Sequence, residues 1–179
     1  EGPAALDVFW NEVDKLRDLF KFEFFYAPTE QFHQQIREEL ARYTENWEEF
    51  VQQGGPGFLQ IQNNMLLLVS HVTLLTYAEA YSIVADLLAR MDGSESLTDE
   101  QCVAKALKHG HQAYLQRRIS SPASIGKLVF KNGFKLAQHR TLTEGGADVA
   151  GRRKAFAAEI RDVLRRLELI RALGVAIRG

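Results

Sequence analysis

The fold and charge pattern of this chain centre on the stretch Gln101–Thr143, which reads QCVAKALKHGHQAYLQRRISSPASIGKLVFKNGFKLAQHRTLT. It contains eight Lys or Arg residues and no Asp or Glu, whereas the hundred residues before it carry 18 acidic and 6 basic side chains. The formal net charge of −1 therefore conceals an acidic first half and a basic second half. Such a layout favours an acidic face that docks on a basic one, or a basic face that meets an external anion.

Two helices are predicted in and around this stretch. The first begins at Thr98, whose side chain can form a capping box with Gln101, and it runs to about Gln116 with Tyr114 facing inward. The second opens at Pro122, because proline is tolerated in the first turn of a helix, where its missing N–H costs nothing. This second helix should be mostly buried and expose little besides a basic stripe at every fourth residue: Lys127, Lys131, Lys135 and His139.

Further from this stretch, apolar residues spaced three and four apart predict four more helices. They are expected at Leu6–Phe25, after Thr29 with an apolar seam that continues to Trp47, at Met65–Met91, and along the seam Phe156–Ile170. The sequence therefore predicts an all-α protein, in which residues 1–179 form one domain and a single bundle of about six helices.

Composition limits the class of protein. A chain of 179 residues with 46% hydrophobic and 25% charged residues is large and apolar enough for one folded domain. The single cysteine, Cys102, excludes an internal disulfide and fits a reducing compartment. The most apolar run, Met65–Tyr77, is shorter than the roughly 20 apolar residues that a membrane-spanning helix needs, so it predicts a buried helix. Because the first half of this helix is apolar nearly all round, we expect it at the centre of the bundle. We expect a soluble or surface-associated fragment or processed product without a signal peptide.

Histidine is the first residue type to consider for chemistry. His109 and His111 lie two residues apart, on nearly opposite faces of a helix, so they cannot share a metal ion. His33 and His139 are each followed five residues later by Glu. A continuous helix turns side chains at that spacing about 140° apart, so His33 and Glu38 do not meet, whereas His139 lies near a helix end, where the geometry is freer. We therefore predict no catalytic residue, no metal site and no cofactor in this chain.

An aromatic cluster and a group of cations are the candidate binding residues. The aromatic run at 20–26 is either core or a docking face for a part of the protein absent here, with Phe22, Phe24 and Phe25 as the docking candidates. The candidates for contact with an anion or another domain are Arg117, Arg118, Lys127, Lys131 and Lys135.

Three interpretations of the basic stretch remain open. It is an internal counter-surface for the acidic first half or a neighbouring domain, or it faces an anionic membrane surface, where each Lys or Arg contributes about 1 kcal/mol. Nucleic acid ranks last, because no reading motif is present and the aromatic residues fall on the expected core side. An Arg pair such as Arg117 and Arg118 is also common simply as a partner of a helix C-terminal dipole.

Several short stretches, in order, resemble the C-terminal region of PlsB-type glycerol-3-phosphate acyltransferases. They match from near Leu16 to about Leu142 and are Leu19-Phe20-Lys21-Phe22-Glu23-Phe24-Phe25 with Pro28, Glu79-Ala80-Tyr81, Tyr114-Leu115-Gln116-Arg117-Arg118-Ile119, Ser124, Leu128, Phe130 and Leu136-Ala137. Each stretch is short, and the specificity of the resemblance comes from their order and separations.

The resemblance implies an enzyme that transfers a fatty acyl group from acyl-CoA or acyl-carrier protein to the 1-position of glycerol 3-phosphate in phospholipid synthesis. It implies a peripheral location at the cytoplasmic face of the inner membrane, and an upstream domain that carries the family's catalytic His-x4-Asp motif. No His in this sequence is followed by Asp at that spacing. The chain is therefore expected to be a helical C-terminal domain, inactive alone, whose partner is that catalytic domain. The alternative is a free-standing helical module that binds proteins or anionic lipid surfaces.

Overall fold

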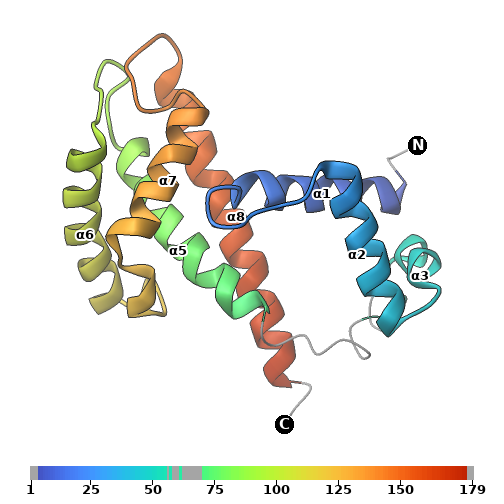
Figure 1. Ribbon diagram of the computed structural model, residues 1–179. Helices are drawn as coiled ribbons and strands as arrows, with labels where there is room; N and C mark the ends of the chain where they lie inside the picture. The colour runs from blue at the N-terminus through green and yellow to red at the C-terminus, as the bar shows by residue number, and fades with distance from the viewer. Residues whose placement is uncertain (1–3, 56, 58–60, 62–69, 177–179) are drawn as a thin grey trace. The chain divides into compact units, whose positions relative to one another are not determined.

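The computed structural model describes residues 4–55, 57, 61 and 70–176. Within these residues it contains seven α-helices, one short 3-10 turn and no strand, which confirms the predicted all-α class (Figure 1). The chain divides into two compact units, residues 1–67 and residues 68–179, where the sequence predicted a single bundle. The physical reason is that the aromatic side chains of the first three helices bury one another in a core of their own.

The first unit contains α1 (Ala5–Leu19), α2 (Thr29–Tyr43) and α3 (Trp47–Gln53). Its core consists of the buried residues Trp47, Val51 and Ile61, against which Phe9 and Trp10 of α1 pack. The Trp47 ring lies 5.5 Å from the Phe9 ring and 6.0 Å from the Trp10 ring, centroid to centroid. Aromatic pairs at such separations contribute beyond their buried area, so α1 and α3 are held together mainly by rings.

Two predictions for this unit were wrong. Helix α1 ends at Leu19, six residues before the predicted end, and the chain then turns so that Phe20 is buried and its ring packs 6.5 Å from that of Phe24. The helix after Thr29 does not continue to Trp47, because Thr44 has extended backbone (φ −153°, ψ 107°) and a new helix begins at Trp47. In both places, burial of an aromatic side chain outweighs continuation of the helix.

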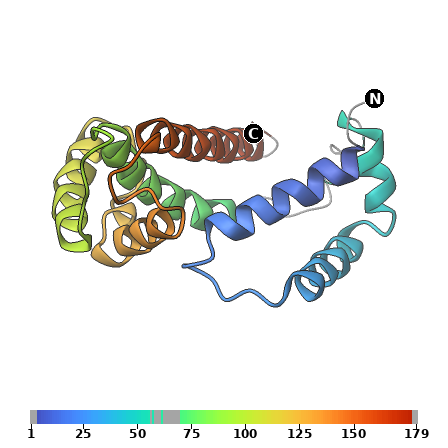
Figure 2. The ribbon, with the colours of Figure 1, turned by 90° about the horizontal axis from the view of Figure 1, so that it is seen from above.

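The second unit is built around α5 (Ser70–Ala89), which contacts α6 (Asp99–Leu115), α7 (Lys127–His139) and α8 (Val149–Ala176) (Figures 1 and 2). The described helix His71–Ala89 is long and apolar enough to cross a membrane, but 56% of it is buried in the structure, as expected of a core helix. Helix α7 approaches closely, since a Cβ at Gly133 would lie 3.1 Å from the Tyr81 ring. The predicted central position of this helix is confirmed; its predicted start at Met65 lies outside the described residues.

Of the two predicted helix starts, the one at Thr98 is confirmed and the one at Pro122 is wrong. At α6 the capping box is present, because Thr98 Oγ1 accepts from the Gln101 N–H at 3.3 Å and Gln101 Oε1 accepts from the Thr98 N–H at 3.1 Å. Pro122, by contrast, opens a 3-10 turn, η1 (Pro122–Ser124), and α7 begins only at Lys127.

A fully buried guanidinium joins the two loops at the upper end of this unit in Figure 1. Arg153 of α8 donates to the carbonyl oxygens of Leu142 and Glu144 in the α7–α8 loop, at 2.8 and 3.3 Å. It also donates to the carbonyl oxygens of Asp92 and Glu95 in the α5–α6 loop, both at 2.7 Å. Burial lowers the pKa of Arg153, an effect that the Glu95 charge partly opposes.

We predict that Arg153→Ala lowers the free energy of unfolding by about 3–5 kcal/mol, because it leaves buried carbonyl groups unsatisfied and opens a cavity. Chemical denaturation of both proteins measures the difference. The neighbouring substitution Lys154→Ala, at an exposed position, should change stability by no more than about 0.5 kcal/mol. Equal effects at the two positions would refute this role.

Candidate functional site

Exposed basic side chains lie where α6 ends and α7 begins. We call this segment, residues 114–128, the α6–α7 corner. Helix α6 ends in a Schellman motif: the Arg118 N–H donates to the Ala113 carbonyl and the Arg117 N–H to the Tyr114 carbonyl, each at 2.9 Å. Arg117 takes the left-handed conformation, with φ 57°, at the position that glycine normally occupies. An arginine there is strained by roughly 1–2 kcal/mol and turns out from the helix end.

A buried carboxylate from the core helix holds this corner in place. Glu79 is only 4% exposed, and its side chain accepts hydrogen bonds from the Ser124 hydroxyl at 2.5 Å and from the N–H groups of Ser120 and Ser121 at 2.6 and 3.4 Å. Hydrogen bonds to a charged group are roughly twice as strong as neutral ones. Glu79 and Ser124 belong to separate stretches of the family resemblance, and the structure brings the two side chains together.

The five predicted cations are all exposed, but their surroundings differ. Lys131 pairs with Asp99 at 3.2 Å, and Arg118 Nε donates to Gln116 Oε1 at 2.9 Å. The side chains of Arg117, Lys127 and Lys135 make no hydrogen bond or ion pair within the described part of the chain. Arg117 and Lys127 therefore carry their charge outward from the α6–α7 corner itself.

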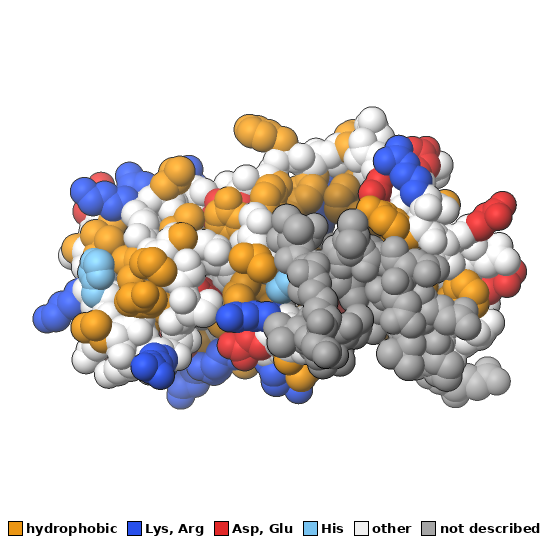
Figure 3. Space-filling view, turned by 90° about the horizontal axis from the view of Figure 1, so that it is seen from below, with side chains coloured by type: hydrophobic (Ala, Val, Ile, Leu, Met, Phe, Trp, Pro, Cys, Tyr) orange, Lys and Arg blue, Asp and Glu red, His pale blue; other side chains and the backbone are white. Residues whose placement is uncertain are grey.

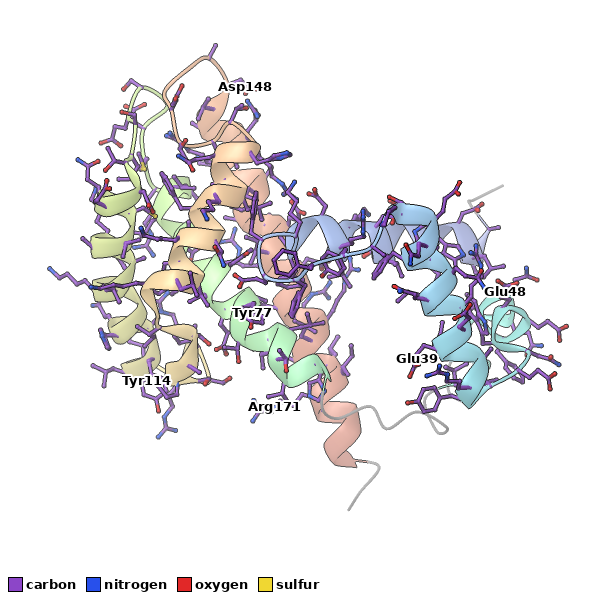
Figure 4. All side chains as sticks on the ribbon, in the orientation of Figure 1. Glu39, Glu48, Tyr77, Tyr114, Asp148 and Arg171 are labelled. Carbon is purple, nitrogen blue, oxygen red and sulfur yellow. The ribbon has the colours of Figure 1, made fainter. Side chains whose placement is uncertain are left out.

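Exposed apolar side chains accompany these charges. Tyr114 is 41% exposed, Leu115 81% and Leu128 70%. The prediction that Tyr114 faces inward and that the α7 helix exposes little but lysines was therefore wrong, because both helices expose apolar residues where they meet the corner. Figure 4 labels Tyr114 at the lower end of α6, and the space-filling view from below shows hydrophobic and basic side chains interspersed (Figure 3).

The three docking candidates in the aromatic run lie in different environments. Phe24 packs on the rings of Phe20 and Tyr26, at 6.5 and 6.1 Å, and Phe22 is partly buried beside Lys21. Phe25, by contrast, is fully exposed. The run 20–26 therefore contains both kinds of residue: Phe24 packs locally, as a core residue would, and Phe25 is exposed, as a docking residue would be.

The prediction that His33 and Glu38 do not meet is confirmed, because each side chain has another partner. His33 Nε2 lies 2.8 Å from Asp14 Oδ1 and its ring lies 4.5 Å from Trp10, so it joins α2 to α1, while Glu38 accepts from Gln34. His139 lines an open depression of about 520 Å³ that also includes the Arg140–Glu159 ion pair. Within the described residues, no group of three or more His, Cys, Asp or Glu side chains is placed to hold a metal ion.

We predict that Glu79→Gln destabilises the chain by about 1–3 kcal/mol, since the charged acceptor of three hydrogen bonds is lost. The α6–α7 corner should also become the first site of cleavage in limited proteolysis, because its backbone N–H groups lose their anchor. Glu168→Gln, an exposed change on α8, is the matched control and should leave both properties unaltered. An unchanged cleavage pattern in Glu79→Gln would contradict the anchoring role.

The sequence of the chain is similar to one family of known proteins. The sequence model of the glycerol-3-phosphate acyltransferase C-terminal region matches residues 3–145. Proteins named as acyltransferase plsB1 from Mycobacterium bovis and from two strains of Mycobacterium tuberculosis are 33% identical over 165 residues. The alignment covers 91% of this chain but only 26% of each relative, so the chain spans about a quarter of their length. No solved structure matches the chain significantly.

Proposed function

The chain belongs to the glycerol-3-phosphate acyltransferase C-terminal region family, and from this premise we propose that it is the non-catalytic helical part of a glycerol-3-phosphate 1-O-acyltransferase. One observation carries the proposal: the chain aligns with about a quarter of the length of each relative, and these relatives are named as acyltransferases. The remaining length of such a protein leaves room for a catalytic domain. The missing His-x4-Asp spacing in this sequence supports the same division of labour.

In the proposed function, this chain docks on the catalytic domain and supports its activity. Phe25 is fully exposed, while the rings around it pack on one another. A single exposed aromatic ring on a short, otherwise ordered turn is the kind of anchor that dominates protein interfaces. In this proposal Phe25 enters a pocket on the catalytic domain, and acyl-CoA or acyl-carrier protein delivers the acyl group to that domain.

The experiment separates the two parts of the enzyme. Acyl transfer to glycerol 3-phosphate is assayed with this chain alone, with the catalytic part of the same protein alone, and with both mixed. We predict no activity from the chain alone and a rise in activity on mixing. Phe25→Ser should weaken that rise at least tenfold without changing the thermal midpoint, whereas Val8→Ser, also at an exposed apolar position, should not. Activity of the chain alone would overturn the proposal.

The second proposed role is contact with an anionic membrane surface through the α6–α7 corner. Arg117 and Lys127 project positive charge there, and Leu115 and Leu128 are exposed apolar side chains beside them. Each cation near an anionic surface contributes about 1 kcal/mol, and each Leu that enters the interface contributes roughly 1.5–3 kcal/mol. This combination supports a peripheral location at the cytoplasmic face of the membrane.

Co-sedimentation with vesicles checks this role. We predict binding to phosphatidylglycerol vesicles at 50 mM salt that falls steeply at 500 mM salt, and little binding to phosphatidylcholine vesicles. Lys127→Gln and Arg117→Gly should each weaken binding about fivefold, and Leu128→Ser at least tenfold. Arg117→Gly is informative because it relieves the left-handed strain and should raise the thermal midpoint. Lys154→Gln on α8 is the control, and equal binding to neutral and anionic vesicles would refute the role.

A further inference from the structure

A cavity of about 410 Å³ lies between α5 and α6. Its lining includes none of the five candidate cations Arg117, Arg118, Lys127, Lys131 and Lys135. Arg90, directly after α5, and Lys105, Lys108 and His109 of α6 contribute to its wall. The three residues of α6 recur at spacings of three and four, which places their side chains along one side of the helix. Four cationic or titratable side chains, three from α6 and one from the residue directly after α5, thus line one cavity.

The positive charge in this cavity is only partly offset by the chain itself. The side chains of Arg90, Lys105, Lys108 and His109 make no hydrogen bond or ion pair with any residue that the structure describes. Glu95, the acidic member of the lining, supplies one negative charge against the three cations and accepts a hydrogen bond from the Asp92 N–H at 2.7 Å. An anion that enters the cavity would therefore meet free donors.

The titration of His109 reports the same excess of positive charge. Burial lowers the pKa of His109, and the charges of Arg90, Arg118 and Lys108 lower it further, against an opposing effect of Asp86. The charges that act on its ring thus come from Asp86 and Arg90 on the α5 side, and from Lys108 and Arg118 of α6 and the turn after it. A bound anion would offset these cations and raise the pKa of His109.

The cavity is also partly apolar. Leu87 and Leu97 line it and are 8% and 7% exposed, and Met91 lies between them in the sequence. A volume of about 410 Å³ falls in the range of ligand sites, which is about 300–1,000 Å³. The space therefore combines a cationic rim with a small apolar floor, which is the complement of an amphipathic anion.

We propose that this cavity binds a phosphate monoester that carries a short apolar substituent, with the phosphate between Arg90, Lys105 and Lys108 and the substituent on Leu87 and Leu97. A phosphate monoester carries a charge of about −1.5 to −2 at pH 7 and offers three strong acceptor oxygens, which matches three permanent cations. The planar fork of arginine binds phosphate through two parallel hydrogen bonds. A carboxylate has half the charge and leaves donors unused.

Titration of the 179-residue chain with hexyl phosphate tests this proposal, with inorganic phosphate and hexyl sulfate as comparison ligands. Calorimetry should give one saturable site, at which hexyl phosphate binds at least tenfold tighter than either comparison ligand. In NMR titrations, the His109 ring signal, identified by its loss in His109→Gln, should titrate at higher pH when hexyl phosphate is bound.

Single-charge variants locate the site. Lys108→Gln and Arg90→Gln should each weaken hexyl phosphate binding at least fivefold, Lys108→Arg should retain it, and Lys154→Gln outside the cavity should change it less than twofold. Each variant's thermal midpoint is checked, so that loss of binding is separated from loss of fold. The proposal is overturned if hexyl phosphate does not saturate a site, if inorganic phosphate binds equally well, or if Lys154→Gln is as damaging as Lys108→Gln. Vesicle binding does not enter these measurements, so the outcome is independent of the membrane role.

Discussion

The buried carboxylate of Glu79 is the interaction on which the candidate surface depends. It sits on the core helix α5 and is satisfied by two backbone N–H groups and one hydroxyl, rather than by a cation, within the part of the chain that the structure describes. A charge is buried at acceptable free energy only if it is fully hydrogen-bonded, so Glu79 and the loop must adopt their positions together. The core helix thereby fixes the loop that follows Arg117 and Arg118.

At the other end of the second unit, Arg153 anchors loops by donating hydrogen bonds, where Glu79 anchors a loop by accepting them. Its donors meet carbonyl oxygens of two loops, near Asp148 at the upper end in Figure 4, as Glu79 meets the N–H groups of one loop at the lower end. Loops carry backbone groups that helices cannot satisfy, and a unit of four helices has few other means of pairing them. One buried anion and one buried cation thus replace the regular hydrogen bonds that these connections lack.

Local signals in the sequence were reliable where the cause is itself local. The capping box at Thr98 and the central position of α5 depend on neighbouring residues and on apolar content, and both were predicted. Helix α1 ends where Phe20 is buried and packs on Phe24, and the break before Trp47 allows its ring to pack on Phe9 and Trp10 of α1. The periodicity of apolar residues reports neither contact. Arg117, Lys127 and Lys135 could be named as candidates because charge is visible in the sequence, and their role stays a prediction. Glu79 and Ser124 stand 45 positions apart, so their contact required coordinates. The same holds for the cavity between α5 and α6, since its cations belong to different helices.

The separation of charge along the sequence gains a physical meaning once the two units are known. Residues 1–67 carry 12 acidic and 5 basic side chains, whereas residues 68–179 carry 11 acidic and 17 basic ones. Ion pairs of the first unit lie within helices, as in Lys15–Glu12 and Arg42–Glu39, and between helices, as in Arg37–Glu48, and they leave its acidic excess in place. In the proposed membrane role, an anionic surface attracts the basic second unit and not the acidic first unit. The exposed apolar residues at the α6–α7 corner then select the part of the second unit that enters the interface.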